Sequence, residues 1–233
     1  MTGAQTKTPT PSAPPGASPA RHLKPLMRGW LHVGSFFTFL LLGLLLLALN
    51  DASRRHRLTL VIYLLGTLAM FGTSALYHRG RWSEWQLQTW RRLDHSTIFL
   101  AIAGAYTPVA VVGLDQSARR IILIVCWTGA VIGIGLQWVR MALPRALFTT
   151  VYIIVGWSIV PFVSQLHARL GTLGLSMIVG GGLAYTLGAV VYAIKRPDPW
   201  PTVFGYHEVF HLMTLIGAGL HLATVAFVVM PKM

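Results

Sequence analysis

Residues 30–49 read W-L-H-V-G-S-F-F-T-F-L-L-L-G-L-L-L-L-A-L and contain no Asp, Glu, Lys or Arg. A helix of this length rises about 30 Å, which matches the hydrocarbon core of a bilayer. The run is too long for the apolar segment of a signal peptide, and no convincing cleavage site follows it. This stretch therefore predicts a transmembrane helix.

Six more apolar stretches follow, and the composition agrees with a membrane protein. Of the 233 residues, 54% are hydrophobic and 11% are charged, whereas soluble proteins carry about 25% charged residues. The predicted spans are 29–49, 57–77, 93–113, 120–139, 146–165, 171–194 and 207–230. The longest loops that we expect are 78–92 and 195–206. The sequence thus predicts an all-α fold, a seven-transmembrane helix bundle.

The chain divides into a tail and one membrane domain. Residues 1–24 are rich in Pro, Thr, Ser and Ala over most of their length. Such a composition cannot bury a core, so we expect a disordered tail. Residues 25–231 form the expected seven-helix domain. Its single cysteine, Cys126, lies in an apolar run, which excludes an intrachain disulfide.

Basic residues lie in short clusters between the apolar runs. The net charge of +13 is therefore not gathered in one patch, and we expect no nucleic acid partner. With seven spans, twelve Lys and Arg fall on the side of the N-terminus and seven on the other side. Cytoplasmic loops carry the excess of Lys and Arg, so we expect a cytoplasmic N-terminus.

Several ionisable side chains are expected at one membrane face. His78 ends the second span, Asp94 begins the third, and His207 and His211 begin the seventh. Odd-numbered spans run in the same direction, so the starts of the third and seventh spans share a face with the end of the second. Ionisable groups at membrane depth are costly and commonly functional.

Their spacing indicates a metal site. His207 and His211 are four residues apart and lie on one face of a helix. His78 would add a third imidazole and leave a fourth position for water, as in catalytic zinc sites. Asp94 could hydrogen-bond that water, and Ser74 lies one turn before His78. Taken alone, Asp94 is also a possible helix N-cap, and Ser74 a serine bonded to its own helix.

The H-E-V-F-H sequence at 207–211 has the form of a zinc protease motif. However, Glu208 points about 100° away from His207 around the helix, and no carboxylate motif of an intramembrane protease is present. We therefore interpret Glu208 as a carboxylate at a helix start or as a neighbour of the metal ligands. His95 must face away from Asp94. His221 lies about 15 Å further along the helix than His211, too far to share the metal.

Four motifs in order resemble the bacterial hemolysin III family, which is related to the adiponectin and progestin receptors and to the alkaline ceramidases. They are S-A-L-Y-H at 74–78, R-L-D-H-S at 92–96, A-G-A-Y-T-P at 103–108 and H-E-V-F-H at 207–211. The resemblance implies seven helices in the inner membrane of a bacterium with a cytoplasmic N-terminus. It also implies Zn²⁺ bound by His78, His207 and His211, with Asp94 and Ser74 beside it.

Three functions are compatible with these features. The first is a zinc-dependent hydrolase of a lipid amide or ester, with a membrane lipid or fatty-acyl substrate, as the ceramidase kinship suggests. The second is a receptor-like sensor of membrane lipid state, in which zinc is structural. The third is the cytolysin of the family name, which the sequence disfavours because seven apolar spans could not stay soluble before insertion.

Overall fold

The described part of the chain is built from helices. The computed structural model describes residues 24–50, 53–139 and 145–233, so the expected disordered tail lies outside it except for Lys24. The main helices are α1 (Trp30–Ala48), α2 (Arg54–Arg79), α3 (Glu84–Gly113), α4 (Gln116–Trp138), α5 (Arg145–Gly156), α6 (Val163–Ile194) and α7 (Tyr206–Thr224). Within these ranges the β contacts amount to one isolated bridge between Trp200 and Phe204. The all-α prediction is confirmed.

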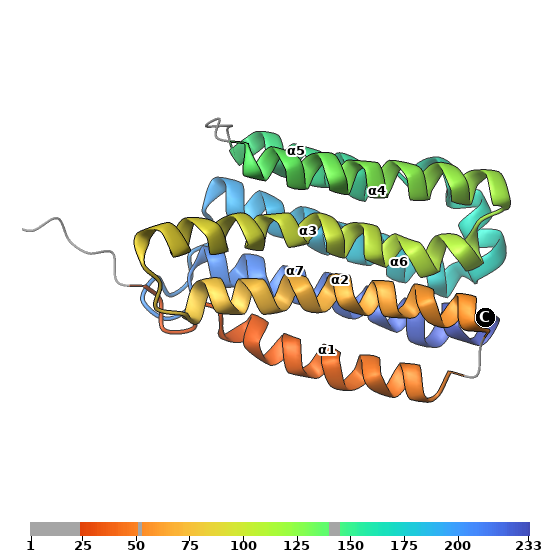
Figure 1. Cartoon of the computed structure of the whole chain (residues 1–233), viewed down its shortest axis with the longest axis horizontal. Coiled ribbons are helices and arrows are strands. Elements are labelled where there is room, and N and C mark those ends of the chain that lie inside the picture. The colour runs from red at the N-terminus through yellow and green to blue at the C-terminus, as the bar shows by residue number, and fades with distance from the viewer. Residues whose placement is uncertain (1–23, 51–52, 140–144) are drawn as a thin grey trace, which may run out of the picture.

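The helices lie roughly side by side along one axis (Figure 1). Helix α2 packs along α3, and α6 packs along α7. One buried cluster, which includes Phe99, Ile122 and Leu166, joins α3, α4 and α6. A second, which includes Phe39, Phe71 and Leu222, joins α1, α2 and α7. The two clusters together hold α1 at one edge of the bundle and α4 at the other.

The outer surface of the bundle is apolar. Leu41 on α1 is 69% exposed and Val131 on α4 is 70% exposed. Six helical stretches of the described residues are long and apolar enough to cross a membrane. Backbone polar groups in a bilayer must be satisfied within the chain, which helices achieve. The protein is therefore a multi-pass membrane protein whose exposed apolar side chains face lipid.

One of these stretches, Leu147–Ile194, has 48 residues. A continuous helix of that length would extend about 72 Å, more than twice the hydrocarbon thickness. Its backbone changes direction at Gly171, where φ is 73° and ψ is 177°. Residues other than glycine are strained in this backbone conformation. In Figure 1 the chain runs along α5 to one end of the bundle and returns along α6.

Two helices begin at polar residues that a hydropathy pattern overlooks. Helix α3 begins at Glu84, so the loop expected at 78–92 is helical over most of its length and that boundary was wrong. The Ser83 amide donates to the Gln86 side chain (3.0 Å) and fixes this start. At the start of α4, the Ala118 amide donates to Asp115 Oδ1 (2.8 Å). This hydrogen bond lowers the pKa of the Asp115 carboxyl.

Candidate metal centre

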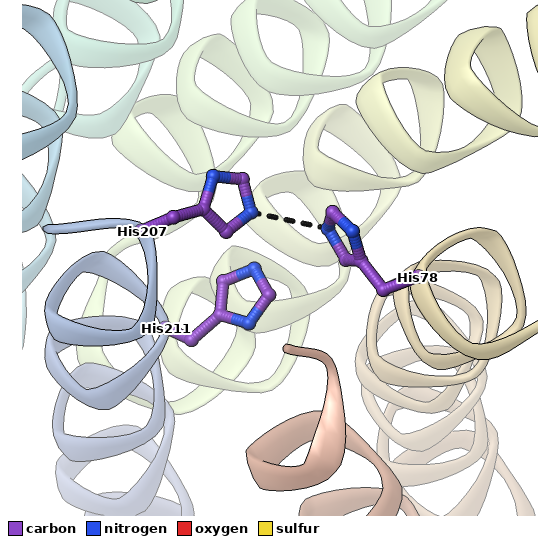
Figure 2. A group of neighbouring side chains, drawn as sticks. All are labelled: His78, His207 and His211. Atoms are coloured by element: carbon purple, nitrogen blue, oxygen red, sulfur yellow. Dashed lines mark hydrogen bonds between the residues drawn. The ribbon is translucent and has the colours of Figure 1, made fainter. Parts of the chain in front are cut away.

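Three histidines from two helices meet at one end of the bundle. His78 lies in the last turn of α2, and His207 and His211 lie in the first two turns of α7. One ring nitrogen from each lies within 4.8 Å of the others. Figure 2 shows the three imidazoles converging on one point. The three histidines, which were predicted to share one membrane face, thus lie together at one end of the bundle.

The separation of the nitrogens suits a zinc ion. The Nε2 atoms of His78 and His207 lie 3.1 Å apart. Two nitrogens bound to one tetrahedral zinc at about 2.05 Å lie about 3.3 Å apart. The same distance also permits a hydrogen bond between the rings when one nitrogen carries a proton. His78 and His211 are buried and His207 is half-buried, so the three neutral nitrogens form a donor set that zinc prefers.

The start of α7 is held by carboxylates rather than by solvent. The Tyr206 amide donates to Asp198 Oδ1 (2.8 Å), and the Gly205 amide donates to Glu208 Oε2 (2.9 Å). Asp198 is an exposed loop residue, and its carboxylate caps this helix. Because His207 lies next to these bonds, they fix the height and rotation of the turn that presents both α7 histidines.

Glu208 makes an ion pair that the sequence pattern did not reveal. Its Oε1 pairs with Nε of Arg28, which precedes α1, while its Oε2 accepts from the Gly205 amide. The side chain of Glu208 is 1% exposed. Both carboxylate oxygens therefore have partners other than a metal or its water. The expected place of Glu208 at a helix start is confirmed, and the zinc protease geometry does not occur.

The segment before and within α1 adds two further groups to the centre. The His32 ring stacks on His211 with centroids 3.8 Å apart and planes 14° apart. Lys24 donates to the His78 carbonyl at the C-terminus of α2, where a cation complements the helix dipole. Burial, aided by the charges of Arg28 and Arg79, lowers the pKa of Lys24. His32 was not among the residues predicted to form the site, although an ionisable residue within an apolar span is a signal for one.

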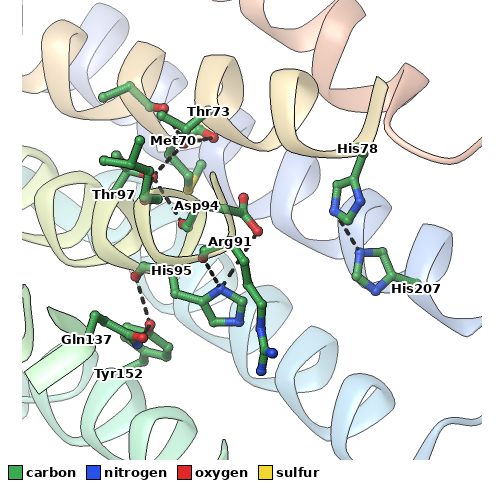
Figure 3. A network of polar contacts seen from close by, with 12 residues as sticks. Met70, Thr73, His78, Arg91, Asp94, His95, Thr97, Gln137, Tyr152 and His207 are labelled. Carbon is green, nitrogen blue, oxygen red and sulfur yellow. Dashed lines mark hydrogen bonds and ion pairs between the residues drawn. The ribbon is translucent and has the colours of Figure 1, made fainter. Parts of the chain in front are cut away.

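Asp94 and Ser74 lie beside the histidines, but not among them. Asp94 is well inside α3 rather than in its first turn, so it is not a helix N-cap. Figure 3 shows its carboxylate on the side of α3 that faces His78 and His207. The Ser74 hydroxyl interacts with the Asp94 carboxylate, and Ser74 is buried one turn before His78 on α2. The group of three possible metal ligands does not include Asp94.

His95 was predicted to face away from Asp94, but both side chains line the same cavity. Its Nδ1 lies 2.7 Å from the Arg91 carbonyl and 3.9 Å from Asp94 Oδ2. The Tyr152 hydroxyl of α5 donates to the His95 carbonyl (2.8 Å). These contacts tie α3 to α5 beside the centre.

A cavity of about 1140 Å³ opens from the three histidines into the bundle. Its charged lining residues all come from the segment before α1 and the first part of α3, and they are Lys24, Arg28, Arg91, Arg92 and Asp94. The lining farther along α5 and α6 is mostly apolar, with Ile153, Ile178 and Val179 among its members. The space therefore has one polar end at the histidines and one apolar end.

These features define a multi-pass helical membrane protein with a three-histidine candidate metal centre at the polar end of an internal cavity. The family model for haemolysin-III-related proteins matches residues 20–222, and the chain belongs to this family. Through its relatives the family is connected to the adiponectin receptors.

Three relatives illustrate the similarity. Hemolysin-3 of Bacillus cereus is 33% identical over 141 residues, which are 60% of this chain and 61% of that protein. The aligned region thus spans less than two thirds of the Bacillus cereus protein. The hemolysin-3 homolog of Bacillus subtilis (strain 168) is 27% identical over 187 residues, 80% of this chain and 84% of the relative. The heptahelical transmembrane protein ADIPOR2 of Oryza sativa subsp. japonica is 35% identical over 91 residues, 35% of this chain and 40% of the relative.

Proposed function

We propose that this protein is a zinc-dependent hydrolase that cleaves an amide or ester bond of a membrane lipid. The observation that carries this proposal is the opening of the His78, His207 and His211 group onto a cavity of about 1140 Å³ with an apolar far end. A cavity of this kind accepts an acyl chain, while the polar end accepts the scissile group.

The metal and the neighbouring side chains have separate roles in this proposal. His78, His207 and His211 hold the zinc, which when bound supplies a Lewis acid and an activated water. Asp94 acts as general base and acid, taking a proton from water and returning it to the leaving amine or alcohol. Ser74 holds the Asp94 carboxylate through its hydroxyl.

We also propose that the chain crosses the inner membrane of a bacterium seven times, with its N-terminus in the cytoplasm. The 48-residue stretch Leu147–Ile194 is long enough for two crossings, and Gly171 provides the break between them. The Oryza sativa relative is named a heptahelical transmembrane protein. With seven crossings, the Lys and Arg count of twelve against seven supports a cytoplasmic N-terminus.

The enzymatic proposal is tested by hydrolysis of a defined lipid amide. Purified protein in nanodiscs, loaded with one zinc, is incubated with a fluorescent N-acyl amide or a ceramide, and the released fatty acid is quantified. We expect turnover by the wild type and by His167→Ala, which removes an exposed histidine far from the centre. The His211→Ala variant should lose its zinc, and it should then release no fatty acid. Zinc-loaded wild type that hydrolyses neither amides nor esters would overturn the enzymatic proposal.

One observation favours a second candidate, a receptor-like sensor of membrane lipid state with structural zinc. The three histidines come from α2 and α7, so a bound metal would cross-link two helices that are distant in sequence. In that case a deletion strain should show altered fatty-acid composition or membrane fluidity, with no lipid hydrolysis by the purified protein. Unchanged lipids and fluidity would exclude this candidate.

The names of the two Bacillus relatives favour a third candidate, a cytolysin. The exposed apolar surfaces of α1 and α4 instead suit permanent residence in a bilayer. Lysis of added erythrocytes by low concentrations of the purified protein would establish this activity. Intact erythrocytes under the same conditions would exclude it.

A further inference from the structure

A second polar pair lies deeper in the same cavity. His221 on α7 and Tyr185 on α6 both line it, with ring centroids 5.7 Å apart and planes 20° apart. His221 follows His211 by ten residues, so it lies about 15 Å further along α7. The pair is therefore distinct from the metal centre, but a single elongated molecule can reach both.

Each of these rings packs against a glycine of the opposite helix. A Cβ atom on Gly181 of α6 would lie 2.8 Å from Nε2 of His221. A Cβ atom on Gly217 of α7 would lie 2.9 Å from the Tyr185 ring. The sequence alone suggests only close helix packing for the small residues 180–182. The structure shows that two glycines, each four residues before a ring on its own helix, make room for this pair.

Two other polar side chains of the cavity wall are hydrogen-bonded within the protein. Tyr152 donates to the His95 carbonyl, and Trp157 Nε1 donates to Thr186 Oγ1 (3.0 Å). By contrast, Nδ1 of His221 is buried without a hydrogen-bond partner among the described residues. No hydrogen bond joins the Tyr185 hydroxyl to any residue in those same ranges. An unpaired buried nitrogen is unfavourable, and a phenylalanine in place of His221 would avoid that cost. Tyr185 is half-buried, and its side chain lines the cavity.

We propose that His221 and Tyr185 form a binding subsite for a neutral hydroxyl group on the acyl chain of the bound lipid. This inference rests on the proposed lipid ligand, whose polar end lies at the metal centre. A neutral imidazole offers one donor and one acceptor, and a phenol offers both, which matches a hydroxyl. The charged lining residues all lie toward the metal centre, so a charged group has no counter-ion at the pair.

The separation of the two sites fixes the position of the hydroxyl on the chain. A distance of about 15 Å corresponds to roughly twelve carbons of an extended chain. The subsite should therefore select a chain hydroxylated near carbon 12. A hydroxyl close to the carboxyl end would not reach the pair.

The test compares fatty acids of one length that differ in the hydroxyl. Zinc-loaded protein in nanodiscs is titrated with octadecanoic, 2-hydroxyoctadecanoic and 12-hydroxyoctadecanoic acid. We expect the 12-hydroxy acid to bind about fivefold more tightly than octadecanoic acid, as one or two net hydrogen bonds allow. The 2-hydroxy acid should show no such gain. Tyr185→Phe and His221→Phe should abolish the preference and still bind octadecanoic acid.

A control variant distinguishes the effect of this subsite from that of the metal centre. Tyr192→Phe removes a cavity hydroxyl near His207 and should retain the preference. Equal binding of all three acids by the wild type would overturn the subsite and leave the proposed hydrolase intact. A preference that survives both Tyr185→Phe and His221→Phe would also overturn it. If no acid binds, the subsite and the lipid ligand fail together, while the zinc content of the same samples still reports on the metal centre.

Discussion

The Nε2 atoms of His78 on α2 and His207 on α7 lie 3.1 Å apart, although 129 residues separate them in the chain. Helix α1 lies against both of these helices, and its His32 stacks on the third histidine, His211. The centre thus sits where three helices meet. Any group that binds between the histidines must be sensitive to the packing of all three.

Removing one histidine should remove the metal. We expect about one zinc per chain in the wild type and less than about 0.1 in His78→Ala or His207→Ala, because two imidazoles hold zinc much more weakly than three. Elemental analysis of detergent-purified protein measures this ratio. His167→Ala serves as the control and should keep its zinc. Full zinc occupancy in the His78→Ala variant would show that α2 does not contribute a ligand.

Neutralising Asp94 should separate chemistry from metal binding. Asp94→Asn keeps the shape of the side chain but cannot act as a general base, so we expect a loss of about 10²- to 10⁴-fold in lipid amide turnover. Zinc content should stay at the wild-type value because Asp94 is not in the ligand group. Turnover within a few-fold of wild type would exclude Asp94 from the reaction.

The ion pair of Arg28 with Glu208 should matter for stability. Arg28→Met leaves a buried carboxylate without its partner, which we expect to cost about 3–5 kcal/mol. Adding Glu208→Gln to this variant removes the uncompensated charge and should recover part of the loss. Thermal unfolding of the two single variants and the double variant in detergent gives the coupling between them. Purely additive effects would mean that the pair contributes little.

The backbone conformation at Gly171 should make any other residue destabilising there. Its φ of 73° with ψ of 177° is a conformation that costs other residues about 1–3 kcal/mol. We therefore expect Gly171→Ala to lower the unfolding temperature by several degrees. Gly219→Ala is the matched control, because Gly219 lies within α7 and a Cβ there meets nothing within 4 Å. That variant should be neutral or slightly stabilising. An unaffected Gly171→Ala would indicate a different backbone at the break.

Hydropathy alone located most of the long apolar helices of this chain. The predicted starts of the first and last spans lie within one residue of α1 and α7, because an uncharged helix of about twenty residues has no better environment than a bilayer. Boundaries failed at α5 and at α3. The fifth span was predicted to end at residue 165, whereas α5 ends at Gly156 and α6 begins at Val163, and the third span was predicted to begin at residue 93, whereas α3 begins at Glu84. Residues 84–92 are polar enough to resemble a loop, but their helix is set by the Ser83 and Gln86 contact rather than by burial in lipid.

The topology of the spans also determined which histidines come together. Since consecutive helices were expected to alternate in direction, the end of one and the starts of two others were predicted to lie at the same end of the bundle. The order of the spans in the sequence is therefore enough to group His78, Asp94, His207 and His211. Helical periodicity likewise separated Glu208 from the face of its neighbouring histidines.

Only the tertiary structure decided which side chains surround that group. Arg28 reaches Glu208 across 180 residues, and His32 stacks on His211. Gly181 and Gly217 make room for the rings of His221 and Tyr185, and only the packing of α6 against α7 shows this. Hydropathy and helical period constrain the depth and the face of a residue within its own helix. The rotation and separation of neighbouring helices follow from side-chain packing between them, which no single segment encodes.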